Sequence, residues 1–383
     1  MLTSGTARHP TSRCTLHCMR SLSRLWNETG GWGDSPILAD ADILFLFGDR
    51  KMFESGDAFQ RLRDLHPGVP VVGCSTAGEI DGVTLSVGGV VASAIRFDSS
   101  RCEVRHLDIE GLESDEAGRT IADTLPQEGL RHVIAFCDGS FTNGTQLCRG
   151  MASRLADGVS MTGGLAGDGE RFERTLVLSP DGPKENHLCI VGLYGDSLEV
   201  TFGSVGGWDP FGPERIITKS AGNELFELDG EPALGLYKRY LGHHAEQLPS
   251  SALLFPLTIR TESNNLVRTI LGVDEERQSM TFAGDLPEGS TARLMKANFE
   301  RIVDGAGQAA EQSLSALEGS PEFALLISCV GRRLILKQRS EEELEAVRSV
   351  LGETTTMHGF YSYGELCPAG KEASCELHNQ TMT

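Results

Sequence analysis

The stretch GCSTAGEI at residues 73–80 combines a thiol, two hydroxyls and a carboxylate between and after two glycines. Cys74 and Ser75 are residue types that serve as nucleophiles, so a hydrolase-like enzyme is one interpretation of this stretch. The serine elbow of the α/β-hydrolases needs the spacing Gly-x-Ser-x-Gly, whereas Ser75 lies two residues after Gly73 and three before Gly78. We therefore expect no catalysis here and keep a nucleophile at Cys74 or Ser75 as the alternative.

The same stretch does not have the features of a phosphate-binding loop. A Walker loop places lysine after its second glycine, but here Glu79 follows Gly78, and a carboxylate repels phosphate. The chain is also expected to continue into a strand, so no helix N-terminus faces a bound anion. Binding of a nucleotide through this loop is not supported.

Three copies of one unit position such glycine loops along the chain. Each copy reads as an apolar strand, a helix, a second strand and a glycine loop that ends in an acid, and we expect the helices at 58–66, 145–156 and 341–352. The intervals from the glycine closing the first strand to the glycine before the acid are 30, 28 and 33 residues, which is typical of an internal repeat. The recurring acids are Glu79, Asp168 and Glu365. A carboxylate at this place either caps backbone N–H groups of a neighbouring strand or faces a ligand, and both interpretations stay open.

The order of elements predicts an α/β (α+β) fold. Strands that alternate with helices and then pair as hairpins favour a layered sandwich of mixed sheets flanked by helices. A chain of 383 residues is expected to form two domains, preceded by a weakly ordered segment at residues 1–30. In the connecting region we expect a helix at 231–241, a strand at 252–260 and a long helix at about 291–317.

The composition excludes several classes of function. The formal net charge of −20 disfavours nucleic acids and anionic membranes as partners. The chain has no continuous apolar run long enough for a membrane span and no apolar signal segment near its start, so we expect a cytoplasmic protein. Most of the ten cysteines lie in apolar, strand-like runs and are expected to be reduced and buried. Cys14, His17 and Cys18 have the types of metal ligands but lack a second half-site.

Two further segments contain candidate binding residues. The terminal stretch CELHNQTMT holds His378 and Asn379, and such polar side chains on a buried sheet need partners or a ligand. Haem iron takes one histidine in an apolar pocket, so a non-covalent haem b is considered with His378 as its ligand, or with His244 as the second choice. Trp208, in the Gly- and Pro-rich loop 203–213, either covers a pocket or packs between the domains.

The chain resembles the FIST proteins through six motifs in order. They are GCSTAGEI, GGLAGDG, NELFELDGEPALGLYKRYLG, SMTFAGDLPEG, GFYSYGELCP and CELHNQTMT, and the resemblance runs from about residue 40 to the end of the chain. It implies paired domains, FIST-N-like at 31–220 and FIST-C-like at 221–383, that act as intracellular sensory modules for small ligands such as amino acids. The stretches LLFPLTIR, RTILGVDEERQSMTFAGDLPEG and ISCVGRRLILKQR are similar to a subgroup that binds haem, senses nitric oxide and controls a partner histidine kinase or cyclic-di-GMP enzyme. Many relatives have a histidine in the Ser-x-x-Gly-Trp loop, where this chain has Gly206.

Together, these observations predict a cytoplasmic sensor without enzymatic activity. Its ligand pocket is expected between the domains, between the glycine loops, the Trp208 loop and the terminal strand. The predicted ligand-binding residues are Cys74, Ser75, Thr76, Glu79, Trp208, Tyr361, Tyr363, Glu365, His378 and Asn379. A haem-based nitric oxide sensor is the first specific version. The alternative is a sensor of an amino acid or another small polar metabolite.

Overall fold

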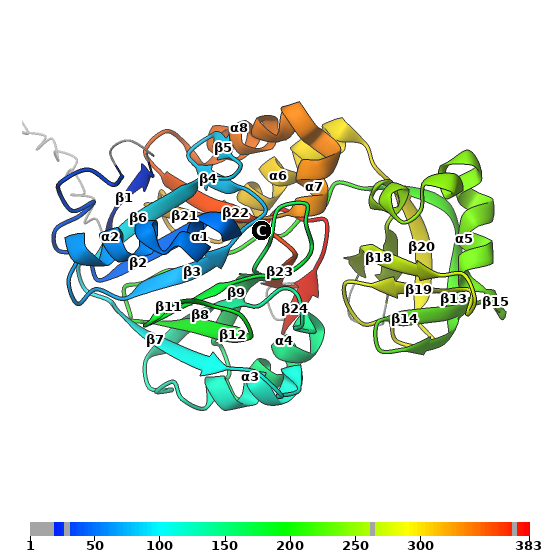
Figure 1. Ribbon diagram of the computed structural model, residues 1–383, viewed down its shortest axis with the longest axis horizontal. Helices are drawn as coiled ribbons and strands as arrows, with labels where there is room; N and C mark the ends of the chain where they lie inside the picture. Colours follow the sequence, from blue (N-terminus) through cyan, green and yellow to red (C-terminus); the bar gives the residue numbers. More distant parts are fainter. Residues whose placement is uncertain (1–18, 27–30, 261–264, 370–373) are drawn as a thin grey trace, which may run out of the picture.

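The computed structural model describes residues 19–26, 31–260, 265–369 and 374–383 (Figure 1). A larger body with three mixed sheets and flanking helices lies beside a smaller body formed by an antiparallel sheet (Figure 1). The predicted mixed α/β architecture with two domains is confirmed. Cys14, His17 and Cys18 lie outside the described residues, and so does most of the predicted weakly ordered segment, but Met19–Leu25 forms β1 at the edge of the first sheet.

The larger body consists of three units with the same order of elements. In each unit a strand is followed by helices, by a second strand parallel to the first, by a hairpin, and by a closing strand antiparallel to the first strand. The predicted repeat is therefore visible in space. The elements of the first unit are β2 (Ile43–Gly48), α1 (Arg50–Ser55), α2 (Asp57–Leu65), β3 (Val71–Ser75), β4 (Glu79–Asp81), β5 (Thr84–Ser86) and β6 (Val90–Phe97).

The second and third units repeat this order with small changes. Strand β7 (Arg101–Asp108) and helix α3 (Ser114–Ala122) precede the second unit, and helix α6 (Phe299–Leu314) precedes the third. In the third unit residues 381–383 take the place of the closing strand beside β21. The elements of the second unit are β8 (Leu130–Cys137), α4 (Gly144–Ala152), β9 (Ser160–Leu165), β10 (Val177–Ser179), β11 (Gly182–Lys184) and β12 (His187–Tyr194). Those of the third are β21 (Phe323–Cys329), α7 (Val330–Leu336), a short 3₁₀ turn (Lys337–Arg339), α8 (Ser340–Leu351), β22 (Thr356–Ser362), β23 (Gly364–Pro368) and β24 (Cys375–His378).

The hairpins interlock the three units. Strand β4 of the first unit pairs with β22 of the third, β10 of the second pairs with β3 of the first, and β23 of the third pairs with β9 of the second. Each unit thus completes the sheet of another one in cyclic order, and the first and last described strands, β1 and β24, belong to one body. The rings of Phe47, Phe136 and Phe360, one from each unit, meet in the core with centroids 4.6 to 6.1 Å apart.

The first glycine of every loop is required by the parallel strand beside it. Gly73, Gly163 and Gly359 face Leu46, Ala135 and Leu326 in register. A Cβ atom at these glycines would lie 2.0, 2.0 and 1.9 Å from the carbonyl oxygens of their partners. Since no side chain fits at such a distance, the two backbones approach each other only with glycine at this place.

The smaller body follows the second unit. Its sheet has the strand order β17-β16-β20-β13-β14-β19-β18, with β15 beside β14, and helix α5 packs on it. The expected helix at 231–241 is α5, which begins two residues later. The elements are β13 (Asp209–Ala221), β14 (Glu224–Leu228), β15 (Glu231–Pro232), α5 (Ala233–Leu241), two 3₁₀ turns (Gly242–Gln247 and Ser250–Leu254), β16 (Leu257–Arg260), β17 (Asn265–Arg268), β18 (Ile270–Asp274), β19 (Ser279–Phe282) and β20 (Thr291–Lys296).

Two expectations for this region are wrong in part. The strand expected at 252–260 begins only at Leu257, after a 3₁₀ turn. The long helix expected at 291–317 is β20 followed by α6, because Ala292 and Leu294 alternate with more exposed neighbours and pack in the smaller body's core. Asn298 then begins the helix, since its side chain accepts a hydrogen bond from the N–H of Arg301.

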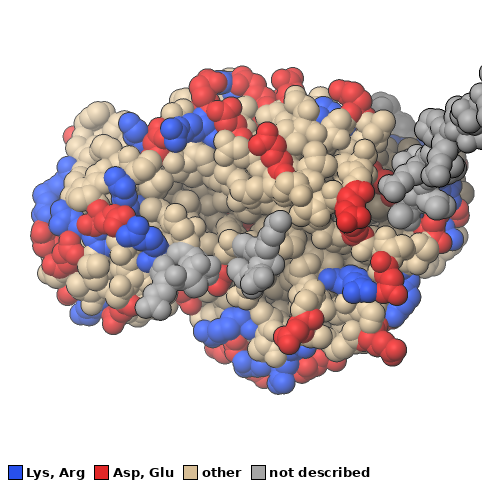
Figure 2. Space-filling view, turned by 180° about the vertical axis from the view of Figure 1, so that it is seen from behind, with Lys and Arg blue, Asp and Glu red and all other residues tan. Residues whose placement is uncertain are grey.

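Charged side chains of both signs are interspersed on the face in Figure 2, around a hollow of mostly uncharged residues. Within the described ranges no helix has both the length and the apolar character to cross a membrane.

Candidate ligand-binding site

The three glycine loops meet at the centre of the larger body, at a place we call the loop hub. It consists of residues 74–78, 165–167 and 361–364, and its members bond to one another through their backbones. The N–H groups of Ala77, Tyr363 and Gly167 donate to the carbonyl oxygens of Tyr361 (2.8 Å), Leu165 (3.2 Å) and Ser75 (2.8 Å), respectively. The first unit thus donates to the third, the third to the second and the second to the first, which is the order in which the units exchange hairpins.

Glu79 and Glu365 occupy the same place in the first and third units. The Oε1 of Glu79 accepts a hydrogen bond from the hydroxyl of Thr76 at 2.6 Å, and its Oε2 accepts one from the N–H of Gly89 at 3.1 Å. Glu365 repeats this arrangement, with bonds from the hydroxyl of Ser362 (2.6 Å) and from the N–H (3.2 Å) and hydroxyl (2.9 Å) of Thr381. Both carboxyl groups therefore tie a glycine loop to a neighbouring chain segment.

Burial changes the charge of these two carboxyl groups. Glu79 and Glu365 are 1% and 0% exposed, and their burial raises the pKa of each to about 8. Both groups are thus largely neutral at pH 7. A neutral, buried carboxyl group is a weak partner for a cationic ligand.

The middle loop differs from the other two. Glu79 faces Phe360 and Glu365 faces Gly164 in register, but in the middle unit the residue in this position is Val177, which faces Cys74. Twelve positions separate Leu165 from Val177, whereas four separate Ser75 from Glu79 and Tyr361 from Glu365. The prediction that Asp168 is the third copy of the two glutamates is therefore wrong. Asp168 lies in an insertion that the other loops lack.

We call residues 167–175 of this insertion the cap segment, since they cover the loop hub. Asp168 is buried, and its Oδ1 accepts hydrogen bonds from the Nε of Arg50 at 2.8 Å and of Arg171 at 2.6 Å. Although burial alone raises the pKa of Asp168, these two guanidinium groups hold it below its ordinary value. Asp168 is thus charged at neutral pH, unlike the two glutamates.

The cap segment also contacts the third unit. The ring of Phe172 stacks on that of Tyr363 with centroids 4.7 Å apart, and Glu170 lies 3.2 Å from the guanidinium of Arg333. Because Arg50 belongs to the first unit and the cap segment to the second, all three units contribute to this contact.

Cys74 and Ser75 do not have the surroundings of activated nucleophiles. Cys74 is fully buried, and burial raises the pKa of its thiol well above the ordinary value. The hydroxyl of Ser75 donates to the carbonyl oxygen of Gly167 at 2.7 Å and accepts from the N–H of Leu176 at 2.8 Å. Ser75 thus fixes both ends of the cap segment, which is a structural role.

A buried relay links the loop hub to the loop that contains Trp208. The hydroxyl of Tyr361 donates to Oε1 of Glu343 at 2.6 Å, and the Nε of Arg332 donates to Oε2 of the same carboxylate at 2.9 Å. Arg332 also donates to the carbonyl oxygen of Gly206 at 2.6 Å. Arg332 and Glu343 are both fully buried. Sequence reasoning missed this pair, although Glu343 falls on the buried face of α8 beside Leu344.

Trp208 packs between the two bodies and also borders a cavity. Its indole Nε1 donates to the carbonyl oxygen of Gln380 at 3.0 Å, and its ring packs with Ile302 and Leu336 of the larger body and Val267 of the smaller one. A cavity of about 450 Å³, which we call the junction cavity, is lined by Gly207, Trp208, Arg301, Asp304 and Gln308. Trp208 therefore packs between the bodies and at the same time borders a cavity.

Two neighbours restrict this loop further. A Cβ atom at Gly206 would lie 2.7 Å from Cδ1 of Trp208, so a histidine there requires the indole to move. Gln380 is fully buried, and neither atom of its amide has a hydrogen-bond partner in the described part of the chain. A buried amide of this kind indicates either an ordered water or a ligand group.

The terminal strand connects the two bodies, and neither His378 nor Asn379 lines the junction cavity. The Nε2 of His378 donates to the carbonyl oxygen of Cys367 at 3.0 Å, and burial lowers the pKa of this ring to about 4. The amide of Asn379 donates to the carbonyl oxygen of His378 at 3.0 Å and accepts from the N–H of Thr269 in the smaller body at 3.4 Å.

The two histidines considered for haem lie far apart in the fold. The Nε2 of His378 donates to the carbonyl oxygen of Cys367, and the ring of His244 lies at a tilt beside those of His243 and Phe255 on the smaller body, with centroids 4.1 and 5.2 Å apart. Neither histidine lines the junction cavity. Outside the masked stretches, no three His, Cys, Asp or Glu residues form a group suited to a metal ion.

The predicted ligand-binding residues are therefore distributed over three places. The hub holds Cys74, Ser75, Thr76, Tyr361 and Tyr363, with Glu79 and Glu365 at its margins. Trp208 lies at the junction cavity, and His378 and Asn379 lie in the seam between the bodies. The side chains of the hub are buried except for that of Tyr363, which is half-buried.

Comparison with models of known families shows the family to which the chain belongs. The model of the FIST N domain matches residues 42–231, and the model of the FIST C domain matches residues 233–368. The chain belongs to the FIST domain family. FIST domains are sensory, ligand-binding domains of signalling proteins and are generally not catalytic.

In this FIST protein the two matches do not correspond to two separate bodies. The border near residue 232 divides the smaller sheet, because β13 and β14 belong to the FIST N match and pair with β20 and β19 of the FIST C match. The FIST C match ends at residue 368, before Thr381, which completes the bonds of Glu365.

The chain is similar to a curated relative and to a solved structure, among others. An uncharacterised protein of Methanocaldococcus jannaschii is 23% identical over an alignment of 332 residues that covers 79% of this chain and 62% of that protein. The chain thus spans about three fifths of the length of this curated relative. A crystal structure of chorismatase is 10% identical, covers 96% of this chain and 98% of its own, and has a TM-score of 0.36, too low to support an argument.

Proposed function

We propose that this FIST protein is a sensor that binds a zwitterionic metabolite of the amino-acid type in the junction cavity and reports it to a signalling partner. The observation that carries the proposal is the lining of this open cavity of about 450 Å³, where the exposed guanidinium, carboxylate and amide of Arg301, Asp304 and Gln308 lie beside the indole of Trp208. That volume lies within the range of small-molecule sites.

Each group of the cavity has a partner in such a ligand. Arg301 and Asp304 are one turn apart on α6, so a carboxylate and an ammonium group of one ligand reach both side chains. One nitrogen of Arg301 already pairs with Asp209 at 3.0 Å, and the guanidinium has further donors for the ligand. Trp208 supplies a rigid apolar wall, since it is only 7% exposed and its Nε1 is bonded to Gln380.

The position of the cavity supports a role in signalling. Trp208 and Asp209 connect the larger body to β13 of the smaller one, and a ligand at this connection favours one relative orientation of the two bodies. The relay through Arg332, Glu343 and Tyr361 extends from Gly206 to the loop hub. The resemblance to a signalling subgroup suggests a histidine kinase or a cyclic-di-GMP enzyme as the protein that reads this change.

Haem and nitric oxide are not part of the proposal, because the Nε2 of His378 is bonded to Cys367 and neither His378 nor His244 lines the junction cavity. An absorption spectrum after addition of haemin checks this separately. We expect no Soret band beyond that of free haemin, and a band that shifts with nitric oxide would replace the proposal.

The test is a thermal-shift panel of the free amino acids, followed by calorimetric titration of those that stabilise the protein. Arg301→Gln and Asp304→Asn are expected to weaken binding about twofold to fivefold, since each removes an ion pair of an exposed side chain, worth roughly 0.2–1 kcal/mol. Arg260→Gln is the matched control, because Arg260 is exposed and pairs with Glu214 away from the cavity. Unchanged affinity in Arg301→Gln and Asp304→Asn contradicts the proposal.

A further inference from the structure

A second cavity, of about 250 Å³, lies at the carboxyl end of β8, and we call it the β8 cavity. Ligands of α/β sheets commonly bind at the carboxyl ends of parallel strands, and β8 is parallel to β9. The cavity lies between the loop that connects β8 to α4, the segment before α3, and Asn186. The residues that line it include Glu110, Leu112, Ser114, Phe141, Thr142 and Asn186.

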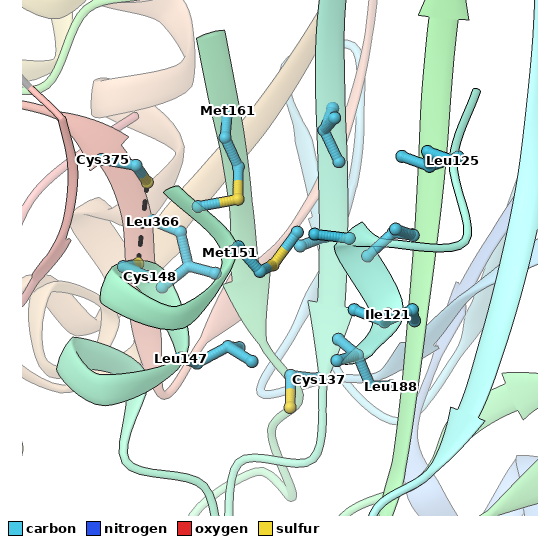
Figure 3. Close-up of a cluster of buried hydrophobic side chains, with 14 of the residues drawn as sticks. Ile121, Leu125, Cys137, Leu147, Cys148, Met151, Met161, Leu188, Leu366 and Cys375 are labelled. Carbon is cyan, nitrogen blue, oxygen red and sulfur yellow. Dashed lines mark hydrogen bonds between the residues drawn. The ribbon is translucent and has the colours of Figure 1, made fainter. Parts of the chain in front are cut away.

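The floor of the β8 cavity carries no charge. The thiol of Cys137 is fully buried and lies 3.0 Å from the hydroxyl of Thr142. Burial raises the pKa of this thiol to about 12, so it carries no charge at neutral pH. Figure 3 shows Cys137 and Leu147 at the lower edge of the apolar cluster that forms one wall, with the sulfur of Cys137 directed out of that cluster.

The loop above this floor is held in place from several sides. Asp138 is fully buried, and its carboxylate accepts hydrogen bonds from the N–H of Ser140 at 2.8 Å, the hydroxyl of Thr175 at 3.0 Å and the N–H of Asn186 at 3.0 Å. Thr175 belongs to the cap segment. The β8 cavity is therefore a formed space whose mouth is fixed by the same loop that contacts the cap segment.

The same loop reaches the smaller body. The amide of Asn143 donates to Oδ1 of Asp285 at 2.8 Å, and its N–H donates to the hydroxyl of Ser114, which lines the cavity. A ligand that changes the position of Thr142 or Ser114 thus acts on a residue that bonds directly to the smaller body.

The charges of the lining select the class of ligand. Glu110 is the one residue with a charged side chain among those that line the cavity, and no arginine or lysine is present there. An anionic ligand meets no counter-charge in this space, whereas a cation pairs with Glu110 and is attracted by the net charge of −20. Ile109, Leu112 and the exposed ring of Phe141 offer contacts to an apolar part of the ligand, and such a ring also attracts a cation.

We propose that the β8 cavity is a second binding site, for a small primary amine with a short apolar body. The ammonium group bonds to Glu110 and to the hydroxyls of Ser114 and Thr142, and the hydrocarbon part contacts Leu112 and Phe141. The site shares no residue with the junction cavity, so it does not depend on the proposed function.

The experiment is saturation-transfer NMR on the whole chain with n-butylamine, butyrate and 1-butanol as probes. At pH 7 the amine is protonated, as a lysine side chain is. We expect saturation transfer to the amine at millimolar concentration, a weaker effect for the alcohol and none for butyrate. Butyrate binding equal to that of the amine overturns the proposal, and so does the absence of transfer to the amine.

Variants locate the bound amine. Glu110→Gln is expected to weaken butylamine binding about threefold to fivefold, in line with a largely exposed ion pair. Glu113→Gln is the matched control, since Glu113 is exposed nearby but does not line the cavity. Unchanged binding in Glu110→Gln, or loss of binding in Arg301→Gln, assigns the amine to another place and overturns the proposal. If butylamine binds as expected while no amino acid binds, only the proposed function fails.

Discussion

The two outer glycine loops and the middle one show how a repeated turn acquires different properties. Glu79 and Glu365 end short loops and bond to hydroxyl and N–H groups in a buried, largely neutral arrangement. The middle loop has Val177 at this position and an insertion in which Asp168 is charged and paired with Arg50 and Arg171. The glycine that permits close strand approach is common to all three loops, because the neighbouring backbone leaves no room for a side chain.

This difference indicates which parts of the hub have a structural role. The outer acids complete hydrogen bonds within the fold and have little charge to offer a ligand. The cap segment breaks the threefold repetition and brings charged groups of all three units together. The glycine loops therefore shape the centre of the body, while the candidate ligand contacts lie at cavities further out.

The largest expected effect concerns the pH dependence caused by Glu365. Because its pKa is raised from about 4.5 to about 8 on folding, the stability contributed by the neutral carboxyl group is fully present below pH 4.5 and is lost as the pH rises to 8. Glu365→Gln keeps the group neutral. Relative to the natural chain, this variant should gain roughly 1.4 kcal/mol per pH unit between pH 5 and pH 8.

Urea unfolding at pH 5, 6, 7 and 8 measures this slope. Glu300→Gln serves as the control, since Glu300 is exposed and its substitution should leave the slope unchanged. Parallel pH profiles of the natural chain and Glu365→Gln would show that Glu365 is ionised throughout, as Asp168 is, and the contrast between the loops would be lost.

Asp168→Ala is expected to cost about 3 kcal/mol of unfolding free energy at pH 7. The substitution leaves Arg50, a largely buried cation, without its one fully buried partner among the described residues, although the more exposed Glu54 and Glu173 still contact it. Because folding lowers the pKa of Asp168, its contribution is present above about pH 4 and is lost as the pH falls further. The cost should therefore shrink in acid, opposite to the behaviour of Glu365.

Unfolding of Asp168→Ala at pH 7 and pH 3 tests this opposite sign. Asp181→Ala is the control, because Asp181 is 81% exposed in its pair with Lys184 and should have almost no effect. A cost that is the same at both pH values contradicts the assignment of charge to the middle loop.

Tyr361→Phe is expected to destabilise the fold by about 1–2 kcal/mol, because it leaves the buried carboxylate of Glu343 with one hydrogen bond fewer. Tyr363→Phe is the matched control from the same loop. Its hydroxyl contacts the carbonyl oxygen of Gly169 at 3.4 Å and backbone groups of Asp168 and Phe172, all in the cap segment and not in the relay. Equal effects of the two substitutions would remove the evidence that the relay to Arg332 matters.

The smallest effect is expected for Phe172→Ala. Phe172 is 51% exposed and its ring stacks on Tyr363, so removal of the ring should cost about 0.5–1 kcal/mol. Limited proteolysis gives a second measurement, in which the cap segment should be cleaved faster in this variant. Unchanged stability and cleavage would mean that the ring of Phe172 does not help to hold the segment.

The repeat, the three helices of the units and the mixed sheets followed from spacing and apolar periodicity, since these patterns are local. The equivalence of Asp168 with the glutamates did not hold, because an interval of 28 residues concealed a longer loop, and only the pairing of Val177 with Cys74 reveals it. Arg332 and Glu343 were missed because charged residues on helices usually face solvent. The sequence could not show that the predicted binding residues lie in three separate places. Their positions depend on which strands of different units pair, and no local pattern reveals this pairing.

The most direct test of the proposed sensor function is hydrogen–deuterium exchange with and without the amino acid that stabilises the protein most. The account predicts slower exchange at residues 205–209 and in α6, around Trp208, Arg301 and Asp304. Protection confined to the glycine loops at 73–79 and 359–365, with none at α6, would contradict it and would return the binding site to the loop hub.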